Sequence, residues 1–528
     1  MGRLFKSTPA AFNDIPETGV DAGWQDLGRG GSVVSRTAFG AAWIIIWRFV
    51  NRFLGIISTL ILARLLLPAD FGVVALAMSF VQGLQQLAEL GTENAIIRAD
   101  MPDRQLYNTG FTINVLRGVG VGCVLAVIAV PAGGFFNTPH FTQVALLAAL
   151  VSVVSSFQNI GVVDYRRYMA FDREFLLKLV PRLLSVTTAV TLAFVLRDYW
   201  ALIIAILVNV CADVLLSYVM HPYRPRFTLA GWPRMASYST LLWLSNIAGL
   251  LGTLGTRSTI TKMTNVSSLG LYELASEIAN LPTTELTGPL TRAMFSGLSE
   301  VRNQADRGAG LLLRMMTTMN VIVLPIGVGL SLVAEPTVRL AFGEKWQGAV
   351  PLLQILALGE AISIFGQMSR QAFAVHGWMK ALLKVTLVFG LSQIAILIVM
   401  ILMFGMPGIA LALIVGSIAN GLVYFVVTMS RLQISWRVLL SRVWRSFVAA
   451  MLMTAALNAA GFGWFDLHTT SNGWPLAWQL CEIIALGTVT YSSSLLVLWL
   501  LAGRPDGPER ELLNCVRSYI FGRLARQR

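Results

Sequence analysis

The sequence predicts an all-α polytopic membrane protein, and three observations support this fold class. Hydrophobic residues make up 55% of the 528 residues and charged residues only 13%, against about 25% charged residues in soluble chains. Fourteen apolar runs approach or exceed the length of a membrane-spanning helix. Basic residues alternate between rich and poor loops along the chain. A soluble enzyme, a disordered protein and a disulfide scaffold are therefore excluded.

The apolar runs form two groups of six and a final pair. The first group comprises 39–63, 71–91, 109–131, 141–160, 175–196 and 200–220. The second group comprises 237–258, 270–296, 311–334, 350–373, 382–404 and 407–429. The pair is 446–462 and 478–502. The weakest runs, 71–91 and 270–296, carry Gln and Glu, and polar helices in membrane proteins usually face the protein interior.

The loops predict the orientation. With the N-terminus in the cytoplasm, 25 of the 40 Lys and Arg residues lie in inside segments and six in outside segments. Cytoplasmic loops carry the excess of positive charge, so we expect both termini in the cytoplasm. The net charge of +13 then reflects topology and contact with anionic lipid headgroups, and we expect no nucleic-acid partner.

An internal repeat relates the two groups of six. Residues 63–76 match residues 261–274 at an offset of 198: in both, a basic residue precedes a Gly by eight positions and a Leu follows that Gly by four. Residues 136–150 match residues 342–356 at an offset of 206. Because six is even, the two repeats run parallel, and transporters built from repeats place their substrate at the repeat interface.

The predicted organisation follows from the runs and the repeat. It comprises a cytoplasmic N-terminal tail, an N-lobe, a cytoplasmic linker, a C-lobe, two further spans and a basic cytoplasmic tail, at 1–38, 39–220, 221–236, 237–429, 430–502 and 503–528.

The chain lacks the usual signatures of catalysis. It has no GxxxxGK[ST] loop for ATP, and its four histidines and four cysteines show no metal-ligand or paired spacing. No outside loop exceeds about 15 residues, which disfavours a membrane polymerase or glycosyltransferase. We expect no catalytic residue, no metal and no cofactor, although coupling to a proton or sodium gradient is possible.

Two arginines stand out in the first run. Arg48 and Arg52 lie near its middle, where a lipid-facing Arg costs about 2.5–3.5 kcal/mol. Being four apart they share one helix face, which Asn51 continues. One interpretation is a buried ion pair with Glu89, Glu273 or Glu277. The favoured interpretation is a water-filled lumen that faces substrate.

Other polar residues in the runs extend this predicted lumen. They are Gln86, Arg117, Arg182, Asn246, Glu273 and Glu277. Arginine presents a planar fork of donors that matches phosphate oxygens, and amides suit sugar hydroxyls. For Glu273 and Glu277 three roles stay open: pairing with lumen arginines, carrying a coupling proton, or holding a cation.

Several stretches resemble one transporter family. They are Leu269–Pro282 (LGLYELASEIANLP), Thr287–Arg292, Phe295–Glu300, Ala63–Gly72 (ARLLLPADFG) and Phe342–Leu358. Together they are similar to the polysaccharide-transporter (Wzx-type) branch of the multidrug/oligosaccharidyl-lipid/polysaccharide exporter (MOP) superfamily. The likeness runs from about residue 35 to residue 430 and is densest at 262–360. Phe295-Ser296 stands where many relatives have Phe-Pro.

The resemblance implies both an architecture and an activity. It implies two six-helix lobes around a central cavity, two extra C-terminal helices, and alternating access. The implied substrate is undecaprenyl-diphosphate carrying an oligosaccharide repeat unit, moved to the periplasmic leaflet of a bacterial inner membrane for exopolysaccharide, capsule or O-antigen synthesis. Arginines in the first helix of related flippases contact the diphosphate, and Arg48 and Arg52 fall in the matching helix.

We therefore expect a flippase for lipid-linked oligosaccharides rather than an enzyme. Arg48 and Arg52 would hold the diphosphate, Arg117 and Arg182 would be secondary cavity cations, and the remaining residues would meet sugar or tune charge. Polysaccharide polymerase or export proteins are possible partners. The alternatives are a peptidoglycan-precursor flippase, a drug/cation antiporter of the same superfamily, a membrane polymerase and a scaffold subunit.

Overall fold

Every regular element among the described residues is a helix, which confirms the all-α fold class. The computed structural model describes residues 33–89, 91–99, 102–138, 140–232, 240–300, 305–376, 378–464, 474–505 and 507–510. Within these ranges it describes the side chains except those of residues 33–41, 94, 98, 240–251, 286–300, 305–306, 374, 379 and 380. Contacts between residues divide the chain into two units, Met1–Gly270 and Leu271–Arg528.

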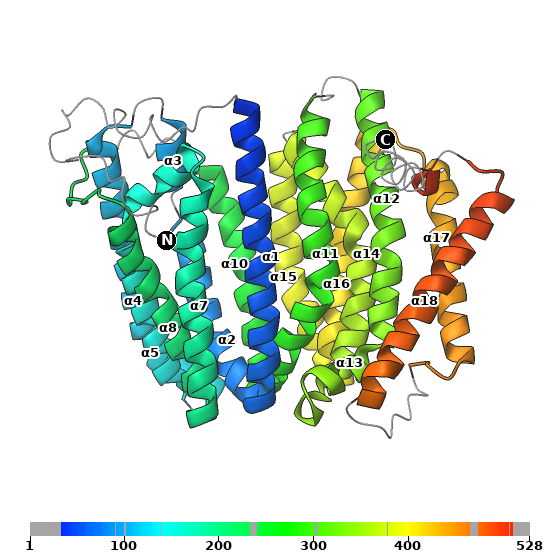
Figure 1. Cartoon of the computed structure of the whole chain (residues 1–528), viewed down its shortest axis with the longest axis horizontal. Coiled ribbons are helices and arrows are strands. Elements are labelled where there is room, and N and C mark those ends of the chain that lie inside the picture. Colours follow the sequence, from blue (N-terminus) through cyan, green and yellow to red (C-terminus); the bar gives the residue numbers. More distant parts are fainter. Residues whose placement is uncertain are drawn as a thin grey trace, which may run out of the picture. The chain divides into compact units, whose positions relative to one another are not determined.

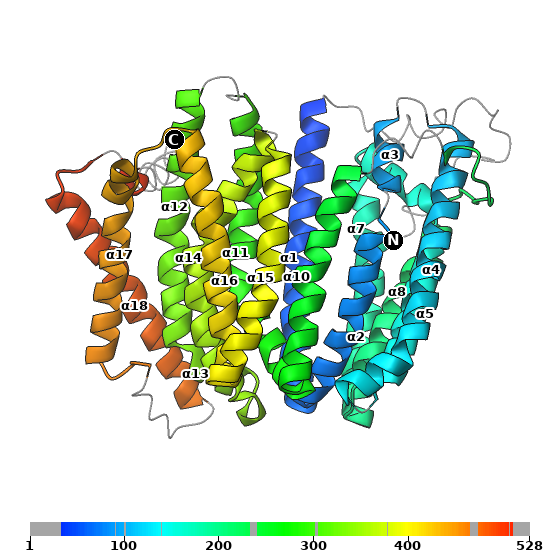
Figure 2. The same ribbon diagram turned by 180° about the vertical axis from the view of Figure 1, so that it is seen from behind.

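The first unit contains a set of long helices and a short broken segment. Its long helices are α1 (Val33–Leu65), α2 (Pro68–Leu87), α4 (Arg104–Phe136), α5 (Phe141–Ser156), α7 (Phe171–Leu196), α8 (Trp200–Met220) and α10 (Thr240–Met263). The short elements are α3 (Thr92–Arg98), η4 (Ile160–Val163) and α6 (Asp164–Arg167). Helix α4 packs against α5, α7 packs against both α1 and α8, and α2 packs against α10 (Figures 1 and 2).

The second unit begins within α11 (Val266–Glu300). The elements that follow are α12 (Ala305–Leu332), α13 (Ala334–Ala341), η5 (Glu344–Trp346), α14 (Ala349–Val375), α15 (Met379–Phe404), α16 (Met406–Arg431), α17 (Trp436–Ala459) and α18 (Trp474–Leu501). Helix α14 packs between α12 and α16, and α17 packs against α12 and α18 (Figure 2).

Each predicted apolar run overlaps one long helix, but the number of spans is not confirmed. Within the described part of the chain, ten helices are long and apolar enough to cross a membrane, or eleven if α5 and the bent segment after it form one span. The helices α2, α10 and α11 are not among the ten. Of these three helices, α2 carries three glutamines, α10 two basic residues and α11 four glutamates.

Local signals set several helix ends. Pro68 opens α2, and the Asp70 carboxylate accepts a hydrogen bond from the Leu67 backbone N–H at 2.8 Å, which satisfies a free donor of the first turn. At α4 the N-cap residue Asp103 is itself the acceptor, and its carboxylate accepts from the Leu106 N–H at 2.9 Å. At the other end of α4, Asn137 adopts φ 48°, a left-handed conformation that ends helices and that Asn tolerates.

Two glycines of the proposed repeat touch each other. A methyl group built on Gly72 would overlap the Val266 carbonyl oxygen, and one built on Gly270 would overlap the Pro68 carbonyl oxygen. Each added carbon would also lie 3.1 Å from the backbone nitrogen of the other glycine. Val266 and Gly270 follow Pro68 and Gly72 by 198 positions (266 − 68 and 270 − 72). The contact is therefore reciprocal between positions that the repeat predicts to be equivalent.

The two last long helices are anchored to the second unit by polar bonds. Tyr491 of α18 donates to the Val321 carbonyl at 2.9 Å, and the Asn320 amide of α12 donates to Ser446 Oγ of α17 at 2.6 Å. Arg445, which falls in the predicted basic loop, instead lies within α17. It holds Glu509 bidentately at 2.8 and 3.1 Å with both side chains buried, so part of the predicted tail packs against the helices.

Candidate functional site

The predicted arginine face of α1 is present in the first unit. Arg48, Asn51 and Arg52 are all partly buried on this helix. Arg182 of α7 joins them, because its Nη2 atom would lie 3.5 Å from a methyl group on Gly55, one turn after Arg52. The packing of α7 on α1 thus brings three of the four predicted cavity arginines into one region.

Aromatic contacts fix the start of α7 against α1. Phe175 stacks obliquely on Trp43 at 4.9 Å between ring centroids and meets Trp47 edge-on at 6.2 Å. Among the described residues, Arg48 makes no hydrogen bond or ion pair. A guanidinium in this setting has donors available for an anion from outside the chain.

Large apolar side chains cover the neighbouring face of α1. Phe49 is 78% exposed and Phe53 61% exposed, and both lie one position beyond an arginine. The helix therefore presents a cationic stripe bordered by an apolar one, as a surface would if it met both a charged headgroup and a hydrocarbon tail.

The other predicted site residues are spread over three helices. Gln86 is exposed on α2, while the side chain of Asn246 on α10 lies outside the described residues. On α11, Glu273 is partly buried and Glu277 exposed, four positions apart on one helix face. Their role in tuning charge or ion coupling stays a prediction.

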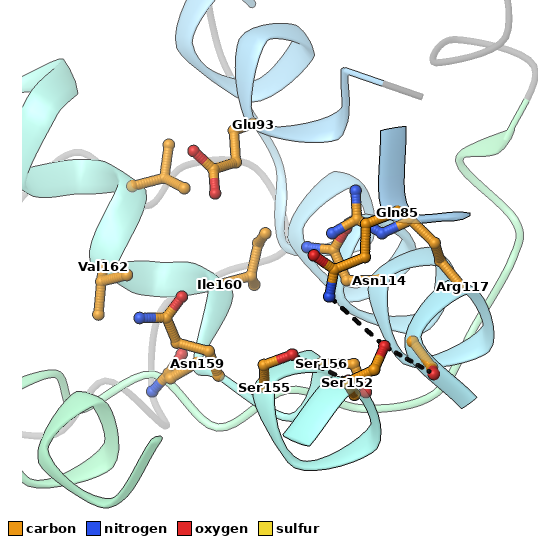
Figure 3. Close-up of a pocket in the computed structure, with 13 residues that line it drawn as sticks. Gln85, Glu93, Asn114, Arg117, Ser152, Ser155, Ser156, Asn159, Ile160 and Val162 are labelled. Atoms are coloured by element: carbon orange, nitrogen blue, oxygen red, sulfur yellow. Dashed lines mark hydrogen bonds between the residues drawn. The ribbon is translucent and has the colours of Figure 1, made fainter. Parts of the chain in front are cut away.

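Arg117, the fourth predicted cavity arginine, lines a polar pocket within the first unit. The pocket measures about 70 Å³ and lies between α2, α3, α4 and the end of α5. Its polar lining comprises Gln85, Glu93, Asn114, Arg117, Ser152, Ser155, Ser156, Gln158 and Asn159. Figure 3 shows the side chains of Gln85, Asn114 and Arg117 gathered together, with Glu93 set apart from Arg117.

The pocket lies at a bend in the chain. Helix α5 ends at Ser156, and after this break η4–α6 continues from Ile160 at an angle of 68°, which is the geometry of a broken span or a re-entrant segment. The apolar run 141–160 is continuous in the sequence and does not predict the break.

Polar bonds from later helices satisfy the broken segment. Ser217 of α8 accepts from the Asn159 backbone N–H at 3.0 Å, and the Asn159 side-chain amide donates to the Tyr223 carbonyl at 2.7 Å. The Tyr223 hydroxyl donates to Asn108 Oδ1 of α4 at 2.6 Å. Burial raises the pKa of Tyr223, so this hydroxyl stays protonated and keeps donating.

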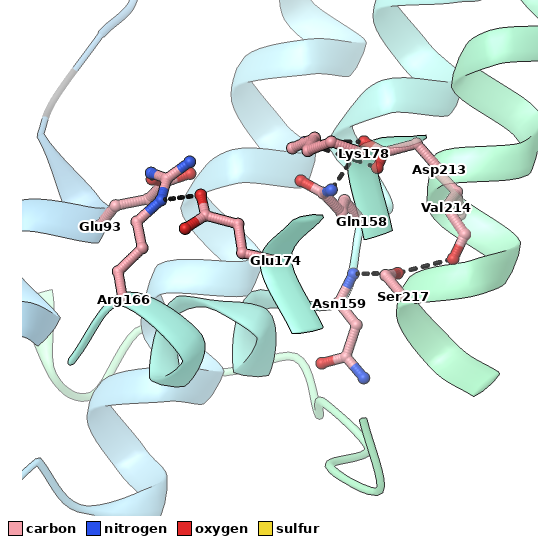
Figure 4. Close-up of polar contacts among 9 residues, drawn as sticks. All are labelled: Glu93, Gln158, Asn159, Arg166, Glu174, Lys178, Asp213, Val214 and Ser217. Atoms are coloured by element: carbon pink, nitrogen blue, oxygen red, sulfur yellow. Dashed lines mark hydrogen bonds and ion pairs between the residues drawn. The ribbon is translucent and has the colours of Figure 1, made fainter. Parts of the chain in front are cut away.

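Two charged networks flank the pocket. Arg166 pairs with Glu93 at 2.9 Å and with Glu174 of α7 at 2.7 Å (Figure 4). On the other side, Gln158 donates to Asp213 Oδ2 at 2.7 Å, and Lys178 contacts the same oxygen at 3.4 Å. None of these residues belongs to the predicted site. The sequence did offer one signal, because Asp213 is the one charged residue in the run 200–220.

The second unit holds an intramembrane carboxylate that was also missed. Glu360 of α14 accepts long contacts of 3.4 Å from Thr283, Ser363 and Gln367. Among the described residues it forms no ion pair.

Comparison with known proteins assigns this architecture to a family. A family model described as polysaccharide biosynthesis protein matches residues 61–351, which is more than half of the chain and includes the pocket. The chain belongs to this polysaccharide biosynthesis protein family. The likeness to polysaccharide transporters expected from the sequence is thus confirmed at the level of this family.

Two relatives of this family member are bacterial polysaccharide proteins. It is 25% identical over 307 residues to the succinoglycan biosynthesis transport protein ExoT of Rhizobium meliloti (strain 1021), covering 57% of this chain and 62% of ExoT. It is 23% identical over 443 residues to the lipopolysaccharide biosynthesis protein WzxC of Escherichia coli (strain K12), covering 81% of this chain and 88% of WzxC. The match thus spans less than two thirds of ExoT but most of WzxC.

Solved structures support the fold of this family member. It resembles the lipid II flippase MurJ in an inward closed conformation with a TM-score of 0.65 at 14% identity, covering 87% of this chain and 99% of MurJ. It resembles an inward-facing multidrug resistance MATE transporter of the MOP superfamily with a TM-score of 0.59 at 16% identity, covering 72% and 94%. Both agree with a polytopic helical membrane protein.

Proposed function

We propose that this protein is a flippase that moves undecaprenyl-diphosphate-linked oligosaccharide repeat units from the cytoplasmic to the periplasmic leaflet of a bacterial inner membrane. Membership of the polysaccharide biosynthesis protein family and the name of WzxC support the pathway, and the name of ExoT supports transport within it. The activity is transport by alternating access rather than catalysis.

The observation that carries the proposal is the cationic face of α1. Arg48 and Arg52 lie on α1 beside an exposed apolar stripe, and the α7 residue Arg182 reaches the same helix at Gly55. Arginine grips phosphate oxygens with two parallel N–H donors, and the bordering apolar side chains suit a polyprenyl tail. Asn51 offers hydrogen bonds to phosphate or sugar.

Several finer features belong to the proposal. The distribution of basic residues supports an orientation with both termini in the cytoplasm. Transport would be coupled to a proton or sodium gradient, with Glu273 and Glu277 as the carboxylates first predicted for that role. Polysaccharide polymerase or export proteins would receive the translocated unit.

The test is a deletion strain complemented with variants. We expect deletion to accumulate complete lipid-linked repeat units on the cytoplasmic leaflet, and wild type to relieve this. The double variant R48A/R52A should insert normally and fail to relieve it. The variant R48K/R52K keeps the charge but loses the planar fork, so it should restore transport only partly, while R437A at an exposed position of α17 should be fully active.

Other outcomes would favour other functions. Repeat units that accumulate singly on the periplasmic leaflet would indicate a polymerase. Accumulation of a peptidoglycan precursor would indicate the lipid II class of flippase. No accumulation of either would favour a drug/cation antiporter or a scaffold.

A further inference from the structure

The polar pocket at the broken span contains a cation that the described part of the chain does not neutralise. Arg117 is partly buried within the apolar run 109–131, and no described residue bonds to its guanidinium. An arginine inside a membrane protein usually pairs with a carboxylate, with backbone carbonyls or with a ligand. The carboxylate that shares the pocket, Glu93, is bound by Arg166 at 2.9 Å.

Asn114, like Arg117, has N–H groups that are available to bind an anion. Asn114 lies three positions before Arg117 on α4, so the two side chains share a helix face. Its Oδ1 atom accepts from Thr92 Oγ1 at 3.0 Å, while its amide N–H groups have no bond to a described residue. The pocket therefore offers five guanidinium donors and two amide donors.

The serine hydroxyls of the pocket already have hydrogen-bond partners within the protein. The Ser155 and Ser156 hydroxyls donate to carbonyls of their own helix at 2.8 and 2.6 Å. Ser152 accepts from the Gln85 amide at 3.4 Å (Figure 3). A methyl group on Gly118 would lie 2.8 Å from the Ser152 carbonyl oxygen, so the absence of a Cβ atom at Gly118 allows α4 to pack closely on α5 next to Arg117.

The volume of the pocket is sufficient for a small ligand. About 70 Å³ is several times the roughly 10–15 Å³ that one water molecule requires. This space admits a small anionic group beside Arg117.

We propose that the pocket formed by Arg117, Asn114 and the break after α5 is a binding site for a single phosphate group. The site lies within the first unit and uses different arginines from the α1 face. The assignment of the phosphate to the transported substrate rests on the proposed function, whereas binding of phosphate as such does not.

The test measures ligand-dependent unfolding of the purified full-length protein. Inorganic phosphate should raise the melting temperature, followed by tryptophan fluorescence in a chloride-free buffer, and chloride should raise it less at equal ionic strength. The R117Q variant should show a smaller phosphate-dependent rise than wild type. The absence of any rise in wild type, an equal rise with chloride, or an undiminished rise in R117Q would each overturn the proposal.

A second variant guards against a folding defect in R117Q. N114D keeps the acceptor for Thr92 and places a carboxylate one helical turn from Arg117, where it would occupy the guanidinium in place of phosphate. We expect N114D to melt at a higher temperature than wild type without ligand and to respond to phosphate at least tenfold more weakly. A wild-type response in N114D would contradict the site.

Different phosphate sources separate this inference from the proposed function. Protein in nanodiscs of zwitterionic lipid should respond to undecaprenyl phosphate if the substrate supplies the group. A response to phosphatidylglycerol but not to undecaprenyl phosphate would assign the site to a lipid headgroup. The R48A/R52A variant should lose transport yet keep the response to inorganic phosphate, so failure of the flippase proposal leaves this measurement intact.

Discussion

Arg445 and Glu509 form a buried, bidentate ion pair between α17 and the segment that follows α18. Their side chains are 3% and 5% exposed, and no described cation other than Arg445 pairs with Glu509. Such a pair contributes little relative to apolar residues of the same shape, but breaking it leaves one buried charge.

We expect R445A to lower the free energy of unfolding by about 3–5 kcal/mol. The double variant R445A/E509A should cost less than the sum of its two single variants, because the remaining buried charge is removed with its partner. Unfolding of the purified protein in denaturing detergent measures both. Equal and additive losses would show that the two residues act independently.

Asn159 illustrates how one side chain holds the broken span. It is fully buried, its Oδ1 atom accepts from the Gly161 N–H at 3.0 Å, and its amide donates to the Tyr223 carbonyl at 2.7 Å. In the N159A variant the Gly161 N–H would lose this partner, while the Tyr223 carbonyl would keep only its bond from Arg224 at 2.9 Å.

We expect N159A to destabilise the protein by about 1–3 kcal/mol for each buried group left unsatisfied. Asn458, exposed on α17, provides the matched control, and N458A should change the melting temperature little. A melting temperature for N159A equal to that of N458A would show that water replaces these bonds.

At the scale of elements, the start of α2 and the start of α11 approach as closely as two backbones can. Gly72 and Gly270 each sit where any Cβ atom would meet a carbonyl of the opposite helix. Small residues of this kind allow close helix packing in membranes, where apolar burial gives no driving force.

We expect G72A and G270A to be equally harmful, because the contact is reciprocal. Overpacking costs about 1–3 kcal/mol where side chains can adjust, and here backbone must move. Gly120 of α4 faces open space, so G120A should be neutral or stabilise the helix by up to about 1 kcal/mol. Yield and melting temperature of the three purified variants test this, and a harmless G270A beside a harmful G72A would contradict the reciprocity.

At the scale of the whole molecule, the orientation can be tested with reporters. We expect green fluorescent protein fused after Arg528 to fluoresce and alkaline phosphatase at the same point to be inactive, since the charge distribution predicts a cytoplasmic C-terminus. Alkaline phosphatase fused after Gly405, between α15 and α16, should be active. The reverse pattern would invert the topology.

The long helices were predictable from the sequence because apolar length determines them. That Arg48 and Arg52 share one face of α1 follows from their spacing of four residues, whereas their role in binding stays a prediction. The break after Ser156 was not, because the run 141–160 is apolar enough to look continuous and the partners of Asn159 lie about 60 residues later. Arg182 reached α1 through packing that no local pattern encodes, and the burial of Arg445 depended on an acid 64 positions away.

The break after α5 also sets an order for biosynthesis. Helix α4 leaves the ribosome before the broken segment, but Ser217 and Tyr223 follow Asn159 by 58 and 64 residues. At about 5–20 residues per second of synthesis, the segment waits roughly 3 to 13 seconds for them. During that interval its polar backbone must remain hydrated, shielded by the insertion machinery, or outside the hydrocarbon. The segment after α5 can therefore form its native hydrogen bonds only after α8 has been synthesised and inserted.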